Sequence, residues 1–175
     1  PDLPEAYSNL ANILSDLGNL KDSEEFFLKA LKLKPHFVEA NSNLASLLKK
    51  IGRENDSYKY YNAAYKYSPN NIYYFINSNL KISPIMQTNA QINDERIQYK
   101  KQIKYLKSLS SMHIGDPNGF NPSMFYFAYH NKLDDRLILE DLADAISKAQ
   151  GMICNDFSQN KYLTYSNQRN YLKIG

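Results

Sequence analysis

Apolar side chains recur at helical spacing at the beginning of the chain. Positions i, i+3, i+4 and i+7 of this segment hold Tyr7, Leu10, Ala11 and Leu14. Residues at this spacing share one face of an α-helix. Gly18 follows at the place where a residue in the left-handed conformation commonly ends a helix. The pattern therefore predicts an amphipathic helix that ends just before Gly18.

A second helical pattern follows directly. Asp22 has Glu25 three residues later, in the manner of a capping box, so we expect the second helix to begin at Asp22. Its apolar residues are Phe26, Phe27, Ala30, Leu31 and Leu33. Pro35 stops the next turn because proline cannot continue a helix. Since Ala11 and Ala30 are small, we expect the axes of the two helices to approach most closely there.

The whole pattern returns 34 residues later, and prolines at positions 1, 35 and 69 mark the period. The residue pairs that share their chemistry are Ala6 and Ala40, Leu10 and Leu44, Ala11 and Ala45, Leu14 and Leu48, Gly18 and Gly52, Ser23 and Ser57, Phe27 and Tyr61, and Ala30 and Ala64. A two-helix unit of this period resembles the tetratricopeptide repeat. The resemblance implies an all-α, right-handed superhelix of about two and a half repeats over residues 1–82, with the first helix of each repeat on the inner wall.

The third repeat departs from the pattern. Asn71 is suited to cap its first helix, but Pro84 interrupts the chain before a second helix of the expected composition. We assign residues 83–112 to a connection and a helix at about 94–109 that caps the array. The apolar positions of this helix include Tyr99, Ile103 and Leu106.

Residues 113–170 have the composition of a loop, an aromatic segment, an amphipathic helix and a polar linker. The aromatic segment 125–132 suits a strand or buried extended chain equally well. The helix is expected at 135–149, capped by Asp134 or Asp135 and stopped by Gly151. Residues 171–175 have the composition of a first strand of a following domain. Because the chain does not start with Met and Pro1 stands where a repeat would close, we expect a piece of a longer protein with at least one earlier repeat.

The net charge of +3 is concentrated in residues 69–112, which hold six bases and two acids. Five of the bases lie on the helix at 94–109: Arg96, Lys100, Lys101, Lys104 and Lys107. They follow acidic residues, as suits the helix dipole, so we interpret them as a solvated face rather than a nucleic-acid patch. Protein partners are expected, without nucleic acid or membrane. The single Cys154 and the lack of a long apolar run favour a cytoplasmic location.

The sequence contains no recognisable pattern of catalytic or metal-binding residues. His36, His113 and His130 stand too far apart to predict one metal site, and Cys154 has no base near it. The glycine-rich stretch 114–122 contains prolines where a phosphate site needs backbone N–H groups. We therefore expect no catalytic residue, no metal and no cofactor in these residues.

A narrower resemblance covers nearly the whole chain. It is carried by SNLANIL, SNLASLL, INDERIQYKKQI, FYFAYHNKLDDR and RNYLKIG, which are similar to the front half of the bacterial O-linked N-acetylglucosamine transferase (SPINDLY-like) family. The resemblance implies a non-catalytic front part that holds the polypeptide acceptor, with a sugar-nucleotide-dependent domain after Gly175. The alternative is a general protein–protein interaction module without sugar chemistry.

Three asparagines recur in register, at Asn9, Asn43 and Asn77. Asn is a poor residue for a helix interior, and on a helical wheel these three turn away from the buried leucine stripe, toward the inner wall. They resemble the asparagine ladder of the transferases, which implies binding of a peptide backbone. Expected neighbours in this groove are Asn12, Ser8 and Ser42, with Ile76 and Leu80 making the last repeat more apolar. The alternative is that the asparagines bond to the neighbouring repeat or face water.

Overall fold

A computed structural model describes residues 3–83, 85–109, 112–113 and 135–149. These residues form seven α-helices in chain order, and within them extended chain pairs only as an isolated bridge between Asn71 and His113. The helices are α1 (Pro4–Asp16), α2 (Leu20–Leu33), α3 (Val38–Lys50), α4 (Glu54–Tyr67), α5 (Ile72–Asn79), α6 (Asn89–Ser108) and α8 (Arg136–Ala149). The all-α fold predicted from the sequence is confirmed.

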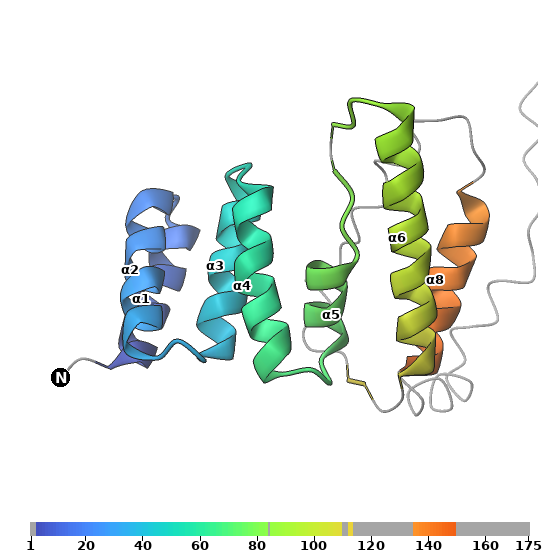
Figure 1. The fold of residues 1–175 in the computed structure, drawn as a ribbon. Helices are drawn as coiled ribbons and strands as arrows, with labels where there is room; N and C mark the ends of the chain where they lie inside the picture. The colour runs from blue at the N-terminus through green and yellow to red at the C-terminus, as the bar shows by residue number, and fades with distance from the viewer. Residues whose placement is uncertain (1–2, 84, 110–111, 114–134, 150–175) are drawn as a thin grey trace, which may run out of the picture.

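The first four helices form two pairs that stand one after the other (Figure 1). Within the first pair, Ala11 and Ala30 are fully buried, and the Ser23 hydroxyl donates to the Ala11 carbonyl oxygen at 2.7 Å. A side-chain oxygen can reach a main-chain carbonyl of the facing helix only where the two backbones are close. Ala45 and Ala64 are fully buried in the second pair. The predicted role of these small residues is confirmed.

Glycines in the left-handed conformation connect the helices of each pair, as predicted. Gly18 and Gly52 have φ of 82° and 79°, where a side chain would be strained. The tight turn lets α2 begin at Leu20, so the prediction that Asp22 caps this helix is wrong. Asp22 instead lies in the first turn, where its charge suits the positive end of the helix dipole.

Two hydrophobic cores follow one another along the chain. The first joins the repeats through Phe27 and Leu31 of α2 and Leu44, Leu47 and Leu48 of α3. The second joins α5, α6 and α8, and its buried residues include Phe75, Ile76, Tyr99, Ile103, Leu106, Ile138 and Leu142. The predicted apolar face of the helix after the repeats is therefore confirmed, and this helix packs against the last helix of the array.

The third repeat is modified as its sequence suggests. The Asn71 side chain accepts from the backbone N–H groups of Tyr73 and Tyr74, which confirms it as the cap of α5. An extended segment, 80–83, takes the place of a second helix and leads toward α6. This helix begins at Asn89, earlier than predicted, because the Thr88 hydroxyl accepts from the Gln91 N–H at 3.1 Å and caps it.

Two of the five basic residues on α6 pair with acidic residues at the start of α8 or within it, so they do not belong to a solvated face. Arg96 is buried and forms an ion pair with Asp135, the residue before α8. Lys107 bonds to Asp141 and Asp144 of α8 at 2.7 and 3.0 Å. The prediction of a solvated face is therefore wrong at these two positions, because α8 covers this side of α6. Lys100, Lys101 and Lys104 are exposed, as predicted.

The helix at the end of the described chain was placed correctly by the sequence, and α8 begins one residue after the predicted start. Asp135 uses its side chain to pair with Arg96, while its carbonyl oxygen accepts from the Leu139 N–H at 3.1 Å. Asp134, the aromatic segment 125–132, His130, Gly151, Cys154 and the strand expected at 171–175 lie outside the described residues.

Candidate functional site

A row of polar side chains crosses the repeats, mainly on their first helices. Its members are Asn12 of α1, Asn43 and Ser46 of α3, Tyr61 of α4, and Tyr73 and Tyr74 of α5. Asn43 of α3 donates from Nδ2 to Oδ1 of Asn12 on α1 at 3.0 Å. This hydrogen bond joins two of the predicted groove residues across the boundary between repeats. Both side chains are partly buried, so they retain contact with the surface.

The row continues from α3 to α5 through hydroxyl groups. Ser46 Oγ lies 2.9 Å from the Tyr61 hydroxyl and 3.3 Å from the Tyr73 hydroxyl, and the two tyrosine hydroxyls are 3.4 Å apart. The rings of Tyr61 and Tyr73 meet edge to face with centroids 6.1 Å apart. Hydroxyl groups both donate and accept, so this cluster can rearrange its hydrogen bonds around a ligand.

The remaining predicted groove residues differ in their accessibility. Asn9 is exposed, whereas Ser8 and Ser42 are buried. Asn77 is partly buried and donates to the carbonyl oxygen of Tyr73 at 2.9 Å, which occupies one of its two N–H groups. Of the predicted set, the structure thus brings together Asn12 and Asn43 by direct contact.

The last repeat does not line the row with apolar side chains. Ile76 and Leu80 are buried in the core shared with α6, so the expectation that they make the groove more apolar is wrong. These two side chains are buried because α6 and the extended segment cover this side of α5. Tyr73 and Tyr74 of α5 take their place at the row.

Two tyrosines of the row, Tyr61 and Tyr74, have hydroxyl groups whose pKa is raised, which favours their neutral form. Burial raises the pKa of the Tyr61 hydroxyl, and the neighbouring Tyr73 acts in the same direction. The pKa of Tyr74 is raised chiefly by burial and by the charge of Glu39, against a hydrogen bond with Ser42 that lowers it. The row therefore offers uncharged donors and acceptors at neutral pH.

Sequence reasoning missed Ser46, Tyr61, Tyr73 and Tyr74 as members of the row. The signal for Ser46 was available, because it stands 34 residues after Asn12 and occupies the same place in the second repeat. The tyrosines of α5 were harder to find, since the corresponding residues of the earlier repeats are glutamate and alanine.

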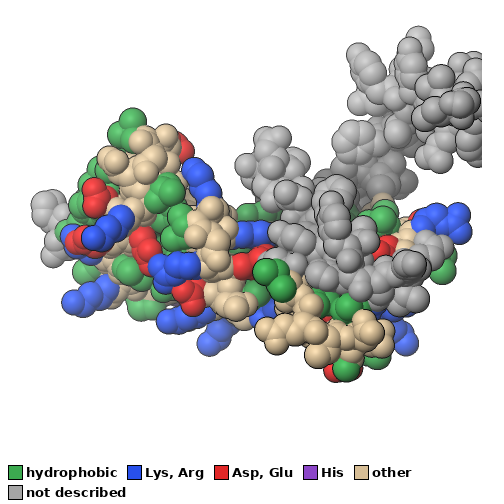
Figure 2. Space-filling view, turned by 90° about the horizontal axis from the view of Figure 1, so that it is seen from above, with side chains coloured by type: hydrophobic (Ala, Val, Ile, Leu, Met, Phe, Trp, Pro, Cys, Tyr) green, Lys and Arg blue, Asp and Glu red, His purple; other side chains and the backbone are tan. Residues whose placement is uncertain are grey.

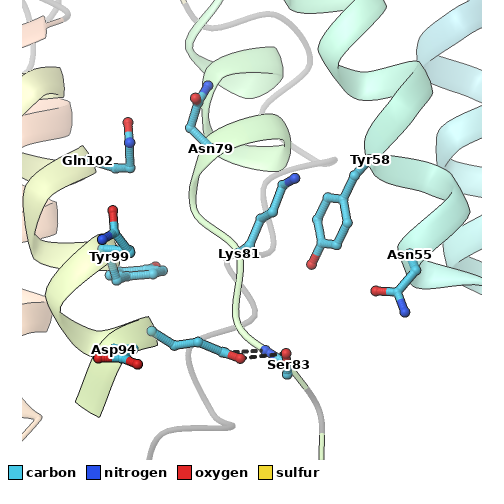
Figure 3. A pocket seen from close by; sticks show the side chains of 10 residues that line it. Asn55, Tyr58, Asn79, Lys81, Ser83, Asp94, Tyr99 and Gln102 are labelled. Carbon is cyan, nitrogen blue, oxygen red and sulfur yellow. Dashed lines mark hydrogen bonds between the residues drawn. The ribbon is translucent and has the colours of Figure 1, made fainter. Parts of the chain in front are cut away.

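A separate cleft of about 450 Å³ lies between α4, the extended segment and α6. Figure 3 shows Lys81 beside the ring of Tyr58, and its Nζ is 4.3 Å from the ring centroid. Across the cleft, Glu95 accepts from the N–H and hydroxyl of Ser83 at 2.7 and 2.6 Å. The cleft exists because an extended segment, rather than a second helix, follows α5.

The surface over the helix pairs carries mixed charge. On the face that Figure 2 shows, basic and acidic side chains are interspersed there. Arg53, for example, bonds to Glu24 of the preceding repeat at 2.8 and 2.9 Å and to Asp56 at 2.8 Å. In the part of the chain that the structure describes, no cluster of three or more His, Cys, Asp or Glu side chains could hold a metal ion. None of the described helices is long and apolar enough to span a membrane.

Comparison with known families agrees with the boundaries of the helix pairs. Residues 4–37 and residues 38–71 each match the tetratricopeptide repeat family. The first match covers α1 and α2, and the second covers α3 and α4 and ends at the cap of α5. No curated protein matches the chain.

Proposed function

We propose that this chain is a protein–protein interaction module whose polar row binds an extended segment of a partner protein. The premise is that residues 4–71 are two tetratricopeptide repeats. Such repeats bury their apolar residues against one another and leave one wall of the array for binding. We infer that the row, to which α1, α3 and α5 contribute together with Tyr61 of α4, lines this wall.

The observation that carries the proposal is the Asn43–Asn12 hydrogen bond across the repeat boundary. Each asparagine has an acceptor and two N–H donors, so one mutual bond leaves further groups for a ligand. The bond also fixes both side chains before a ligand arrives, which reduces the entropy lost on binding. Amide and hydroxyl groups recognise a peptide backbone, which every sequence shares.

The uncharged character of the row indicates what the partner segment presents there. Asn12, Asn43, Ser46 and the neutral tyrosine hydroxyls suit backbone amides better than charged side chains. We therefore expect the module to accept many partner sequences and to show weak dependence on ionic strength.

The test uses the full chain and an array of unstructured peptides of varied sequence. Binding should fall at least about tenfold, roughly the worth of one to two lost hydrogen bonds, when Asn12 and Asn43 are both changed to Ala. The triple variant of Asn9, Asn43 and Asn77 to Ala tests the predicted ladder in the same assay. Asn55→Ala with Asn62→Ala is the matched control, because both are exposed asparagines of α4 that are not members of the row.

Folding of each variant is followed by its thermal unfolding. Loss of binding by a variant that melts like the parent supports the proposal, and unchanged binding by a folded Asn12/Asn43 variant rejects it. If only the triple variant loses binding, the ligand follows the ladder of Asn9, Asn43 and Asn77 rather than the row.

A second candidate function assigns a more specific role to the same polar row. The likeness of SNLANIL, SNLASLL and INDERIQYKKQI to the O-linked N-acetylglucosamine transferases favours a front part that presents a polypeptide acceptor to a glycosyltransferase domain. The test is transfer of sugar from a nucleotide donor to a peptide by the full-length protein. Peptide binding without any transfer would leave the interaction module and remove the transferase hypothesis.

A further inference from the structure

A groove of about 390 Å³ opens between α6 and α8. Figure 1 shows these two helices side by side, at the opposite end of the described helices from α1. They run in the same direction, because Arg96 pairs with Asp135 before α8 and Lys107 pairs with Asp141 within it. The side chains that line the groove are Lys100, Ile103, Lys104 and Lys107 of α6 and Leu137, Ile138 and Asp141 of α8. We call it the basic groove.

Apolar side chains line the basic groove beside its lysines. Ile103 and Ile138 are buried and belong to the second core. Leu137 also lines the groove, yet it is 59 % exposed. A single exposed leucine is common on a protein surface, but this one adjoins a hollow that can receive a second apolar side chain. Contact between the two would remove apolar surface of both from water.

Two lysines of the basic groove have no acidic partner among the described residues. Lys107 is held by Asp141 and Asp144 at 2.7 and 3.0 Å. The side chains of Lys100 and Lys104 are exposed, and within the described part of the chain they form neither an ion pair nor a hydrogen bond. The groove is therefore neutralised near Lys107, and its positive charge remains at Lys100 and Lys104.

We propose that the basic groove binds an acidic segment of a partner protein, which places two carboxylates at Lys100 and Lys104 and an apolar side chain against Leu137. Residues four apart in a helix are separated by about 6 Å along its axis. Alternate residues of an extended chain point to the same side and are separated by about 7 Å. Two acidic residues at alternate positions therefore match the two lysines. This surface is distinct from the uncharged polar row.

The charges of the chain itself argue for an acidic partner over other occupants. Residues 114–134 and 150–175 together hold three acids and four bases, and the whole chain has a net charge of +3, so neither its own segments nor a second copy supplies an acidic stretch of this kind. Asp141 lines the groove and disfavours a row of phosphates. Two free lysines are also fewer than the roughly four to eight basic residues of a typical lipid-binding cluster.

The test uses the full chain and an array of short, acetylated and amidated peptides of Ser and Gly. Each peptide carries two Glu residues at alternate positions and one Leu, whose position changes along the array. Matched arrays have Gln for Glu, or Ser for Leu. At low salt, we expect the best Glu peptide to bind at least about tenfold more tightly than its Gln counterpart. High salt should remove most of this preference, because it screens exposed charges.

Reversing the charge of the groove identifies the lysines. Lys100→Glu with Lys104→Glu should weaken binding of the Glu peptide by about tenfold or more, since two attractions become repulsions. Lys59→Glu with Lys66→Glu is the matched control, because it changes the net charge equally at exposed lysines of α4 that do not line the groove. If thermal unfolding shows that the charge reversal disturbs the fold, the same measurement is made with Lys100→Gln and Lys104→Gln.

The apolar contact is tested separately with Leu137→Ser. This variant should bind the Leu peptide about fivefold more weakly and the Ser peptide as the parent does, whereas general damage to the groove would weaken both. Asn12→Ala with Asn43→Ala should leave binding of the Glu peptide unchanged. Failure of the polar row and failure of the basic groove are therefore separate results.

The proposal is overturned if Glu and Gln peptides bind alike or not at all, if the groove variant and its control lose equal affinity, or if Leu137→Ser acts equally on both peptides. Vesicles that contain phosphatidylserine and a single-stranded oligonucleotide are the competing ligands. Tighter binding of either, lost on Lys100→Glu with Lys104→Glu, would assign the groove to a membrane or a nucleic acid instead. A dimer in sedimentation velocity that the same variant dissociates would assign it to a second copy of the chain.

Discussion

Arg96 of α6 and Asp135, the residue before α8, form an ion pair whose side chains are only 8 % and 17 % exposed. The two residues lie far apart in the sequence, and the pair fixes the start of α8 against the middle of α6. Breaking a buried ion pair is costly, so this contact specifies the position of α8 more strongly than a surface pair would.

Changing Asp135 to Asn should therefore lower the free energy of unfolding by on the order of 3 kcal/mol. The matched control is Glu140→Gln, which removes an exposed pair with Arg136 at 3.9 Å and should cost less than about 0.5 kcal/mol. Urea unfolding followed by circular dichroism measures both. Equal, small effects of the two substitutions would contradict a structural role for the buried pair.

Enlarging a small residue between paired helices should also destabilise the chain. Ala30→Leu places a larger side chain where α1 and α2 are in closest contact, and overpacking of this kind costs roughly 1–3 kcal/mol. Ala6→Leu is the control, because Ala6 lies on the exposed side of α1. Thermal unfolding of the two variants should differ clearly. An Ala30→Leu variant as stable as the parent would show that the helices can move apart without cost.

The turn glycines give a prediction that depends only on backbone conformation. Apart from Gly52 itself and its two chain neighbours, no atom lies within 4 Å of a Cβ added there, so a substitution meets no steric clash with the rest of the fold. Its φ of 79° still disfavours an L side chain, and Gly52→Ala should cost about 1 kcal/mol. Gly52→Asn should cost less, since Asn tolerates this region better, and Gly52→Val should cost more. An order of stability other than Gly, Asn, Ala, Val would reject this account of the turn.

Alkaline pH should destabilise the fold through its buried tyrosines. Burial raises the pKa of Tyr61 and of Tyr99 above the ordinary value of about 10. The unfolded chain then releases a proton near pH 10 that the folded chain retains, so stability is complete below this pH and falls above it. The urea midpoint of Tyr61→Phe should fall less steeply than that of the parent between about pH 9 and 11. Parallel pH profiles of the two chains would contradict this.

The repeats were predictable because each of their features is local in sequence. The stripe with Ala11, the turn at Gly18 and the 34-residue period all depend on neighbours within one or two helices. The start of α2 was placed too late because a tight glycine turn reduces the number of residues between helices. For α6, the signal was Thr88 with Gln91 three residues later, which is a capping pattern inside a stretch that looks like a polar connection.

The features that the sequence did not predict depend on what covers each helix. Arg96 has the appearance of a surface residue on α6, and only the packing of α8 buries it. Leu10 fits the same stripe as Leu44, yet their accessibilities differ because α2 covers α3 and no described helix covers this side of α1. In the candidate site, Asn12 and Asn43 could be named from their register, whereas the contact between Ser46 and Tyr73 required the third repeat to be placed in space.

The backbone of residues 112–113 joins the segment after α6 to the start of α5 and to the end of α8. His113 donates to the Asn70 carbonyl oxygen at 2.9 Å and accepts from the Ile72 N–H at 3.0 Å, and Met112 donates to Ala149 at 2.9 Å. Each helix pair of the repeats needs only a short loop to close, but the two bonds of His113 require the chain to return to the start of α5 after the whole of α6. Closing a long loop costs more entropy than closing a short one, and non-local contacts slow folding. The repeats should therefore form first, and the return of His113 to Asn71 should set the rate at which the last part of the array acquires its native state.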